Sequence, residues 1–242
     1  MIRTGVILPT FRDTPRDALD AARLAVDAGV DGVFCYDHLW PMGQPERPAL
    51  APFPLLGALA ASLPEAVSGR GGPFLGTLVA RVGLVPPDVL AGQFLALVHL
   101  APGRVIAGLG TGDRLSEAEN HGYGIPFPPA AERRADMVSR ARSLKESGMT
   151  VWLAGGAAAR TDESVAAGAA LNLWDADPTL VADRVRESGG LEVTWGGPPP
   201  TSRGALRRNV GDLTRAGATW AIFGWPVDVD ALVQAARDAG PG

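Results

Sequence analysis

The sequence predicts an α/β protein whose strands and helices alternate to form a (β/α)8 barrel. Short apolar runs of strand length alternate with longer amphipathic segments along all 242 residues, and such alternation is typical of parallel β/α architectures. No change in composition marks a second domain, so one domain over residues 1–242 is expected. A doubly wound open sheet would show the same alternation and stays open as the alternative fold.

The eight predicted strands are short apolar runs bounded by glycine, proline or polar residues. They cover residues 4–9, 33–36, 74–82, 104–109, 150–154, 170–174, 191–195 and 219–223. Near-continuous apolar runs of this length are typical of strands that are buried on both faces of a parallel sheet.

A segment with helical spacing of its apolar residues follows each strand. The predicted helices cover residues 14–28, 53–63, 87–100, 132–147, 162–168, 179–188, 203–216 and 228–239. In the first of them, Thr14 is the expected N-cap, Pro15 takes the first helical position and Gly29 ends the helix. Little sequence separates the fourth strand from its helix, which predicts a compact barrel with short insertions.

Composition argues against several classes of function. The net charge of −4 gives no electrostatic reason to expect binding to nucleic acid or to an anionic membrane. The single cysteine, Cys35, excludes an internal disulfide framework and lies in an apolar run, as a buried thiol in a reducing compartment would. The chain shows neither a signal-peptide pattern nor an apolar run of membrane-spanning length, so a cytoplasmic location is expected. Metal-binding motifs such as HExxH and CxxC are absent, and no metal is expected.

Residues 103–133 carry the strongest functional signal. A buried strand breaks into the glycine-spaced turn GLGTGD, and a polar loop follows with Asp113, Ser116, Glu117, Glu119, Asn120 and His121. Glycine lets the backbone approach a ligand where a Cβ would clash, and parallel barrels present their sites at the carboxyl ends of strands. A tight structural turn is the simpler interpretation of the glycines alone, because the full dinucleotide-binding pattern is missing.

A second motif, VFCYDHLWP at residues 33–41, ends an apolar strand at Asp37 and His38. Imidazole can exchange protons near neutral pH, and a neighbouring carboxylate can orient the ring. Together the two segments resemble the bacterial luciferase-like oxidoreductases, and Asp-His-Leu-Trp-Pro is most similar to the branch that uses the deazaflavin coenzyme F420. The resemblance covers nearly the whole chain and favours the barrel over the open sheet.

The resemblance implies roles for these residues. His38 would be a catalytic residue near the reactive carbon of the deazaflavin, and Asp37 would bind the cofactor ring and position His38. Asp113 matches a glutamate that acts as a catalytic acid in F420-dependent glucose-6-phosphate dehydrogenases, and Ser116 matches an asparagine near the flavin ring. Both replacements keep a polar group but alter its reach, so they argue against a sugar-phosphate substrate more than against the cofactor. The same loop would contribute cofactor contacts from Gly110 and Thr111.

Three further segments resemble parts of the family's site. The third strand, GTLV, resembles one in which relatives hold a non-proline cis peptide against the flavin ring; cofactor contacts are expected from Thr77, Leu78 and Val79. Gly155, Gly156 and Ala157 resemble the loop that receives the cofactor phosphate, where backbone N–H groups at a helix start can bind an anion. Trp40 lies close to the position of a tryptophan that shapes the substrate site. A plain strand, a strand-to-helix turn and a packed aromatic are the respective structural alternatives.

The resemblance therefore implies an oxidoreductase that transfers hydride between a small organic substrate and F420, with the cofactor supplying the redox chemistry. One alternative keeps the fold but uses FMN and oxygen, as a luciferase-like monooxygenase does. A second alternative is a non-catalytic flavin-binding protein, because the family includes a shortened non-fluorescent flavoprotein and this chain is also short. The sequence is compatible with a homodimer but does not determine the oligomeric state.

Overall fold

Eight parallel strands form a closed barrel in the computed structural model, which describes residues 1–41, 43–63, 66–67, 70–155 and 161–240. The strands are β1 (Arg3–Ile7), β2 (Gly32–Cys35), β5 (Phe74–Thr77), β7 (Val105–Gly110), β8 (Thr150–Gly155), β9 (Ala170–Trp174), β10 (Val193–Gly197) and β11 (Trp220–Gly224). The ring closes where β1 pairs with β11, Arg3 opposite Trp220, and where β5 pairs with β7. The predicted barrel is confirmed, and the doubly wound alternative is wrong.

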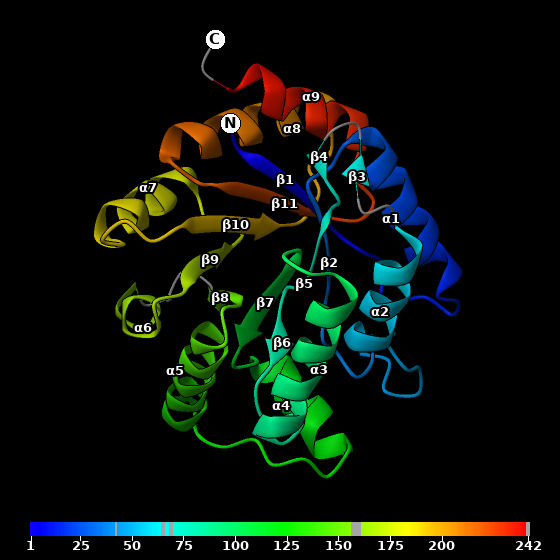
Figure 1. Cartoon of the computed structure of the whole chain (residues 1–242), viewed down its shortest axis with the longest axis vertical. Helices are drawn as coiled ribbons and strands as arrows, with labels where there is room; N and C mark the ends of the chain where they lie inside the picture. Colours follow the sequence, from blue (N-terminus) through cyan, green and yellow to red (C-terminus); the bar gives the residue numbers. More distant parts are fainter. Residues whose placement is uncertain (42, 64–65, 68–69, 156–160, 241–242) are drawn as a thin grey trace.

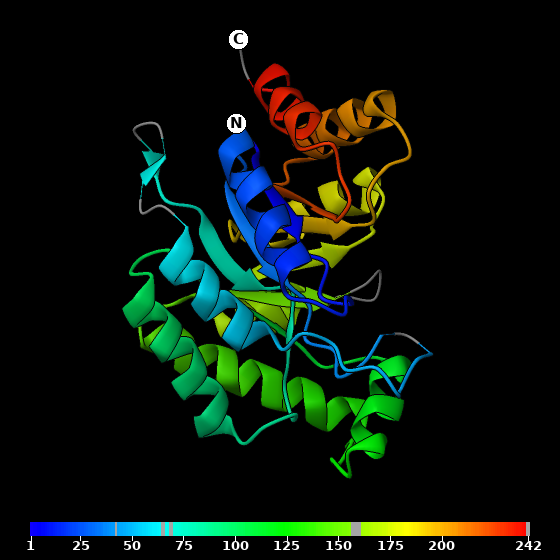
Figure 2. The ribbon, with the colours of Figure 1, turned by 90° about the vertical axis from the view of Figure 1, so that its right-hand side faces the viewer.

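Helices surround the strands on the outside of the barrel (Figure 1). They are α1 (Arg16–Ala28), α2 (Pro52–Ser62), α3 (Pro87–Leu100), α5 (Ala130–Glu146), α6 (Thr161–Ala167), α7 (Pro178–Glu187), α8 (Arg203–Ala216) and α9 (Val229–Asp238). Figure 2 shows α2 and α3 side by side on one flank, where the rings of Phe53 and Phe94 pack edge to face at 5.0 Å. No helix in the described ranges is both long and apolar enough to cross a membrane.

Two predicted boundaries shift for local reasons. The first helix begins at Arg16 with Pro15 as its N-cap, one residue later than predicted, and the Thr14 hydroxyl accepts a hydrogen bond from the Arg16 amide. The seventh barrel strand begins at Val193 instead of residue 191. Gly189 and Gly190 adopt positive φ values, and the turn they form extends to Leu191, whose amide bonds to Ser188.

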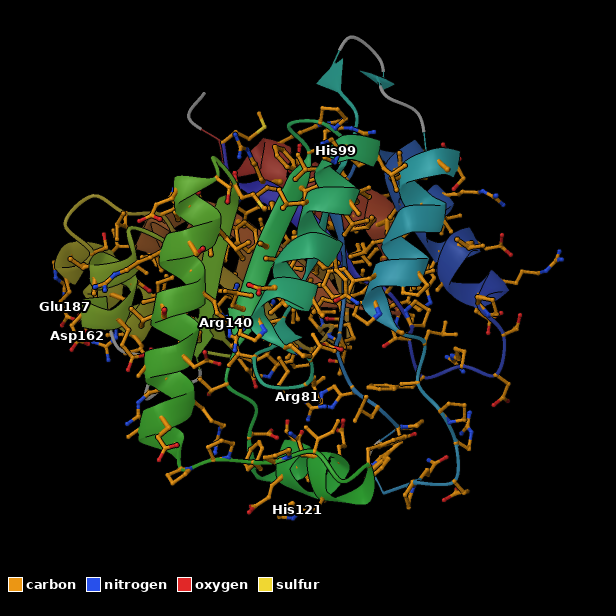
Figure 3. The ribbon with its side chains drawn as sticks, turned by 60° about the horizontal axis from the view of Figure 1, so that its bottom comes forward. Arg81, His99, His121, Arg140, Asp162 and Glu187 are labelled. Carbon is orange, nitrogen blue, oxygen red and sulfur yellow. The ribbon has the colours of Figure 1, made fainter. Side chains whose placement is uncertain are left out.

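Two departures from the predicted elements place the functional site. The segment expected as a polar loop is the helix α4 (Arg114–Gly122). The third strand divides at the Leu78–Val79 bond, which is cis as the resemblance implied, and resumes as β6 (Ala80–Arg81) beside β7. A short antiparallel pair, β3 (Ala66–Val67) and β4 (Arg70–Gly71), lies at the opposite end of the barrel from α4 (Figure 3).

Large apolar side chains fill the barrel interior. The interior cluster comprises Ile7, Phe34, Leu78, Ile106, Trp152, Ala170, Trp220 and Ile222. The rings of Phe34 and Trp220 each lie within 6 Å of Trp152, at 5.4 Å in both cases. Gly5 and Gly76 make room for Phe34, because an added Cβ would lie 2.8 and 3.0 Å from its ring atoms. This part of the barrel is a packed core, so a ligand site is confined to one end of it.

Candidate active site at the carboxyl ends of the strands

The polar residues of the candidate site lie where the barrel strands end. Asp37 and His38 follow β2 after Tyr36, and α4 begins shortly after β7. Arg81, at the end of β6, lies between the strand ends and α4, whereas His121 on α4 points away from the barrel (Figure 3). His99 lies at the other end of the barrel. The residues after β2, the end of β6 and the helix α4 therefore meet at one end of the barrel. His38 is the histidine that lies where they meet.

A buried carboxylate on α4 holds His38. The Nδ1 atom of His38 lies 2.5 Å from Oε1 of Glu119, whose side chain is only 3% exposed while that of His38 is 32% exposed. The other carboxylate oxygen accepts hydrogen bonds from the Leu39 amide at 2.7 Å and from Nη2 of Arg81 at 3.0 Å. Burial raises the pKa of Glu119, but its bonds to His38 and Leu39 and the charge of Arg81 outweigh burial, so the net pKa is lowered.

Arg81 connects this carboxylate to the rest of the site. Its guanidinium donates from Nη1 to the Ser116 carbonyl at 3.1 Å, and its backbone amide donates to Oδ2 of Asp37 at 2.9 Å. Burial raises the pKa of Asp37, and the Arg81 amide and charge offset that rise only in part. Asp37 therefore joins the network through the Arg81 backbone and stands beside His38 without a direct hydrogen bond to it.

Asp113 and Ser116 form the start of α4. Oδ1 of Asp113 accepts hydrogen bonds from the amides of Leu115 and Ser116 and from the Ser116 hydroxyl, at 2.9 to 3.0 Å. The Asp113 amide in turn donates to the Ser116 hydroxyl at 3.2 Å, and the two reciprocal bonds make a capping box. Burial raises the pKa of Asp113, but the three bonds outweigh it and the net pKa is lowered. The structure thus shows capping by both side chains, and their proposed contacts with substrate and cofactor stay predictions.

The glycines of GLGTGD allow the divided third strand to pack against β7. A Cβ on Gly108 would lie 2.1 Å from the Thr77 carbonyl oxygen, and one on Gly110 would lie 2.3 Å from Cγ2 of Val79. The Thr77 hydroxyl is buried and donates to the Gly108 carbonyl at 2.7 Å. Gly108 therefore makes room for a backbone carbonyl and Gly110 for the Val79 side chain, and both let the divided strand pack closely against β7.

Aromatic rings line the mouth next to His38. Phe11 stacks on Tyr36 at 5.9 Å and lies 5.7 Å from the His38 ring, and Trp174 packs edge to face on Tyr36 at 6.0 Å. Burial raises the pKa of Tyr36 to about 12, so its phenol stays protonated near neutral pH. A Cβ on Gly224 would make only ordinary contacts, the nearest at 3.5 Å. The mouth thus combines aromatic side chains with a glycine position that could accommodate a Cβ without a clash.

The structure places the remaining predicted site residues in different surroundings, and their roles stay predictions. Trp40 packs on the end of α4, where it stacks on Tyr123 at 5.6 Å and would lie 2.4 Å from a Cβ on Gly122. The Thr111 carbonyl accepts a hydrogen bond from Arg133. Gly155 ends β8 at the carboxyl side, while Gly156 and Ala157 lie outside the described residues. Within the described ranges, no cluster of three or more His, Cys, Asp or Glu could hold a metal ion.

Sequence reasoning assigned no role to Glu119 or Arg81. Glu119 stood in a segment expected to be a loop, and Arg81 in an apolar strand. A usable signal for the helix was present, because Asp113 precedes Ser116 by three residues and no proline or glycine follows until Gly122. Helical spacing would then have put Glu119 on a defined face, although its partner could not have been named.

Comparison with known proteins agrees with this geometry. Residues 2–146 match the family model described as luciferase-like monooxygenase, and the chain belongs to that family. The F420-dependent glucose-6-phosphate dehydrogenase of Beutenbergia cavernae is 40% identical over 136 residues, which is 56% of this chain and 38% of that protein. The enzyme of the same name from Nakamurella multipartita is 28% identical over 238 residues, 98% of this chain and 61% of that protein. The chain therefore spans less than two thirds of the length of these relatives.

Solved structures share the fold at low sequence identity. An F420-dependent secondary alcohol dehydrogenase in complex with an F420–acetone adduct superposes with a TM-score of 0.77 at 14% identity, covering 99% of both chains. The coenzyme F420-dependent tetrahydromethanopterin reductase of Methanopyrus kandleri gives a TM-score of 0.67 at 13% identity, covering 98% of this chain and 99% of that one. The family resemblance predicted from the two motifs is thus confirmed, together with the barrel.

Proposed function

We propose that this protein is an oxidoreductase that transfers a hydride between a small organic substrate and the deazaflavin coenzyme F420. The observation that carries the proposal is His38, which a buried carboxylate holds at the carboxyl end of the barrel strands. The relatives support the choice of cofactor, because both curated proteins described above are named as F420-dependent enzymes.

The residues at the mouth fit a flat ring system. Tyr36 and Trp174 offer aromatic surfaces, and at Gly224 an added Cβ would occupy space next to the Tyr36 hydroxyl, at 3.7 Å. Leu78, Val79, Asp37, Gly110 and Thr111 would hold the ring. The backbone at Gly155, together with Gly156 and Ala157, would receive the phosphate. When bound, the deazaflavin supplies the carbon that accepts or gives up the hydride.

Within this proposal, His38 moves the proton. Its ring is partly exposed to the mouth, and the Nε2 atom has no hydrogen-bond partner among the described residues. Asp113 is less suited to the task, because three hydrogen bonds lower its pKa and keep it a carboxylate near neutral pH. We therefore assign proton transfer with the substrate oxygen to His38, and give Asp113 and Ser116 the role of holding α4 over the site.

Titration of the purified protein with F420 and with FMN, followed by fluorescence, tests the cofactor. We expect tighter binding of F420. Tighter FMN binding, with rapid reoxidation of the reduced flavin by oxygen, would instead establish the FMN-dependent monooxygenase. Binding of either cofactor without turnover of any alcohol or carbonyl compound in a substrate panel would establish the non-catalytic flavin-binding protein.

A homodimer in the cytoplasm completes the proposal. The outer faces of α2 and α3 are apolar, with Val89, Leu95 and Leu100 between 41% and 53% exposed, and α2 contains no charged residue. An apolar face can bury itself symmetrically against a second copy. Sedimentation of the wild type and of Leu95→Glu is the test: we expect a dimer and a monomer, and a monomeric wild type would contradict this part. The buried, unpaired Cys35 is compatible with the proposed cytoplasmic location.

A further inference from the structure

We propose that Glu119 is the positioning residue of this site: it holds the neutral imidazole of His38 as the Nδ1–H tautomer and so leaves Nε2 as the proton acceptor at the barrel mouth. The catalytic consequence rests on the proposed function. The tautomer is a property of the protein without cofactor, so it can be tested whether or not the proposed function is correct.

The contact between the two side chains fixes where the ring hydrogen lies. Nδ1 of His38 and Oε1 of Glu119 are 2.5 Å apart, which is closer than the roughly 2.7–2.9 Å usual for a charge-assisted N–H···O bond and leaves no room for two bare acceptors to face each other. An ionised carboxylate can only accept hydrogen bonds, so the nitrogen that faces it must carry the hydrogen. In the neutral ring the lone pair is then on Nε2, which has no hydrogen-bond partner among the described residues.

The surroundings of Glu119 keep it ionised. Its second oxygen receives two donors, the Leu39 amide at 2.7 Å and the Arg81 guanidinium at 3.0 Å, and both the Arg81 and the Glu119 side chains are only 3% exposed. A neutral Glu119 would leave the buried positive charge of Arg81 without its partner. The charges of Asp37 and Glu119 repel each other. This repulsion is the smallest influence on the pKa of Asp37, behind burial and the hydrogen bond from the Arg81 amide.

The helix that carries Glu119 is anchored at both ends. The Asp113–Ser116 capping box fixes its first turn, to which Arg81 also donates a hydrogen bond, and Trp40 packs on Gly122 at its last residue. The His38 ring has aromatic neighbours in Phe11 and Tyr36, which offer no competing hydrogen bond to Nδ1. Glu119 is therefore the polar contact that selects the orientation of the ring.

Nitrogen NMR of the cofactor-free protein tests the tautomer. The chain has only three histidines, so the His38 signals can be assigned with His99→Gln and His121→Gln. In the pH range where the ring is neutral, we expect Nδ1 protonated and Nε2 unprotonated in the wild type. A wild-type His38 that carries its hydrogen on Nε2 would overturn the proposal, and this measurement does not depend on any variant at Glu119 folding.

Kinetics of Glu119→Gln then tests the consequence, with glucose 6-phosphate and 2-propanol as probe substrates. The glutamine amide has one oxygen where glutamate has two, and its NH2 group must face either Nδ1 of His38 or Arg81. We therefore expect a mixture of His38 tautomers and a loss of about 100-fold in kcat. The KM for the cofactor should change little. Glu119→Asp keeps the charge but not the reach and should recover part of the rate.

The matched control is Glu117→Gln, an exposed carboxylate on the same helix, which should keep wild-type kinetics and His38 signals. A folded Glu119→Gln protein with unchanged kcat and an unchanged tautomer would overturn the proposal. If the wild type turns over neither probe and binds neither cofactor, the proposed function fails, while the tautomer still decides the role of Glu119.

Discussion

The interior of the barrel and its carboxyl-end mouth solve opposite physical problems. The interior is filled by large rings such as Phe34, Trp152 and Trp220, which are at most 1% exposed, and within the described ranges it holds no charged side chain. The mouth instead buries charge: Arg81 and Glu119 are almost as inaccessible, and they are bonded to each other, with a second bond from Nη1 of Arg81 to the Ser116 carbonyl, while Nε of Arg81 has no partner among the described residues. Apolar burial is tolerant of sequence and adds stability, whereas a buried ion pair is a poor source of stability and has to be complete. Because the buried ion pair at the mouth adds little stability, its presence there indicates that the mouth is the functional region.

The largest expected effect comes from removing the ring at the mouth. His38→Ala should lower turnover by ~10²–10⁴, because a positioned proton-transfer group contributes about that much, while the barrel should stay folded because Glu119 keeps its bonds to Leu39 and Arg81. Steady-state kinetics and a melting curve are the measurements. His121→Ala, an exposed histidine that points away from the barrel, is the control. Equal rates in both variants would place the proton transfer elsewhere.

Removing a ring from the interior should have the reverse effect. Trp152→Ala should lower the free energy of unfolding by about 3–5 kcal/mol, the range for a large aromatic in a packed core, because Trp152 is fully buried against Phe34 and Trp220. Urea unfolding measures the loss. Trp174→Ala at the mouth, where the side chain is 38% exposed, should lose clearly less. Similar losses in the two variants would contradict the division between interior and mouth.

A smaller change at the boundary between the two regions should affect both. Gly110→Ala places a Cβ 2.3 Å from Val79, next to the cis bond, and overpacking of this kind costs about 1–3 kcal/mol. We expect this loss together with weaker F420 binding in the fluorescence titration. Gly92→Ala on α3 has no atom within 4 Å of the added Cβ and should be neutral or slightly stabilising. Unchanged cofactor affinity in Gly110→Ala would remove Gly110 from the cofactor site.

The smallest effect concerns the cap of α4 and depends on pH. Asp113→Ala should cost about 1 kcal/mol of unfolding free energy near neutral pH. Folding lowers the pKa of Asp113 below its ordinary value of 3.8, so its carboxylate stabilises the folded protein above that value and the contribution is lost as the pH falls through the folded pKa. Urea unfolding at several pH values should show the gap to wild type closing in acid.

Asp113→Asn keeps the cap, since asparagine and aspartate cap helices about equally well, but it cannot titrate. This variant should therefore match the wild type near neutral pH and show less loss of stability in acid. A gap between wild type and Asp113→Ala that does not depend on pH would show that the carboxylate charge contributes nothing to the cap.

Much of the fold could be predicted because its signals are local. The helix over residues 203–216 and the strand over residues 170–174 were predicted with their observed bounds, since apolar spacing and capping residues act within a few positions. The helix α4 was predicted as a loop because its exposed, polar surface carries little apolar periodicity. The cis bond could be predicted only from the family resemblance, because the residues Leu78 and Val79 by themselves are ordinary strand formers.

The sequence by itself determined the barrel, the position of His38 at the end of a strand and the glycines of the following turn. Only the tertiary structure decided that Glu119 meets His38, since the two lie 81 residues apart and neither residue type names its partner. It also decided that Asp113 caps a helix and that Gly108 accommodates the Thr77 carbonyl. Periodicity and capping are properties of neighbouring residues, whereas a hydrogen bond between distant side chains depends on how β2, β6 and α4 pack at one end of the barrel.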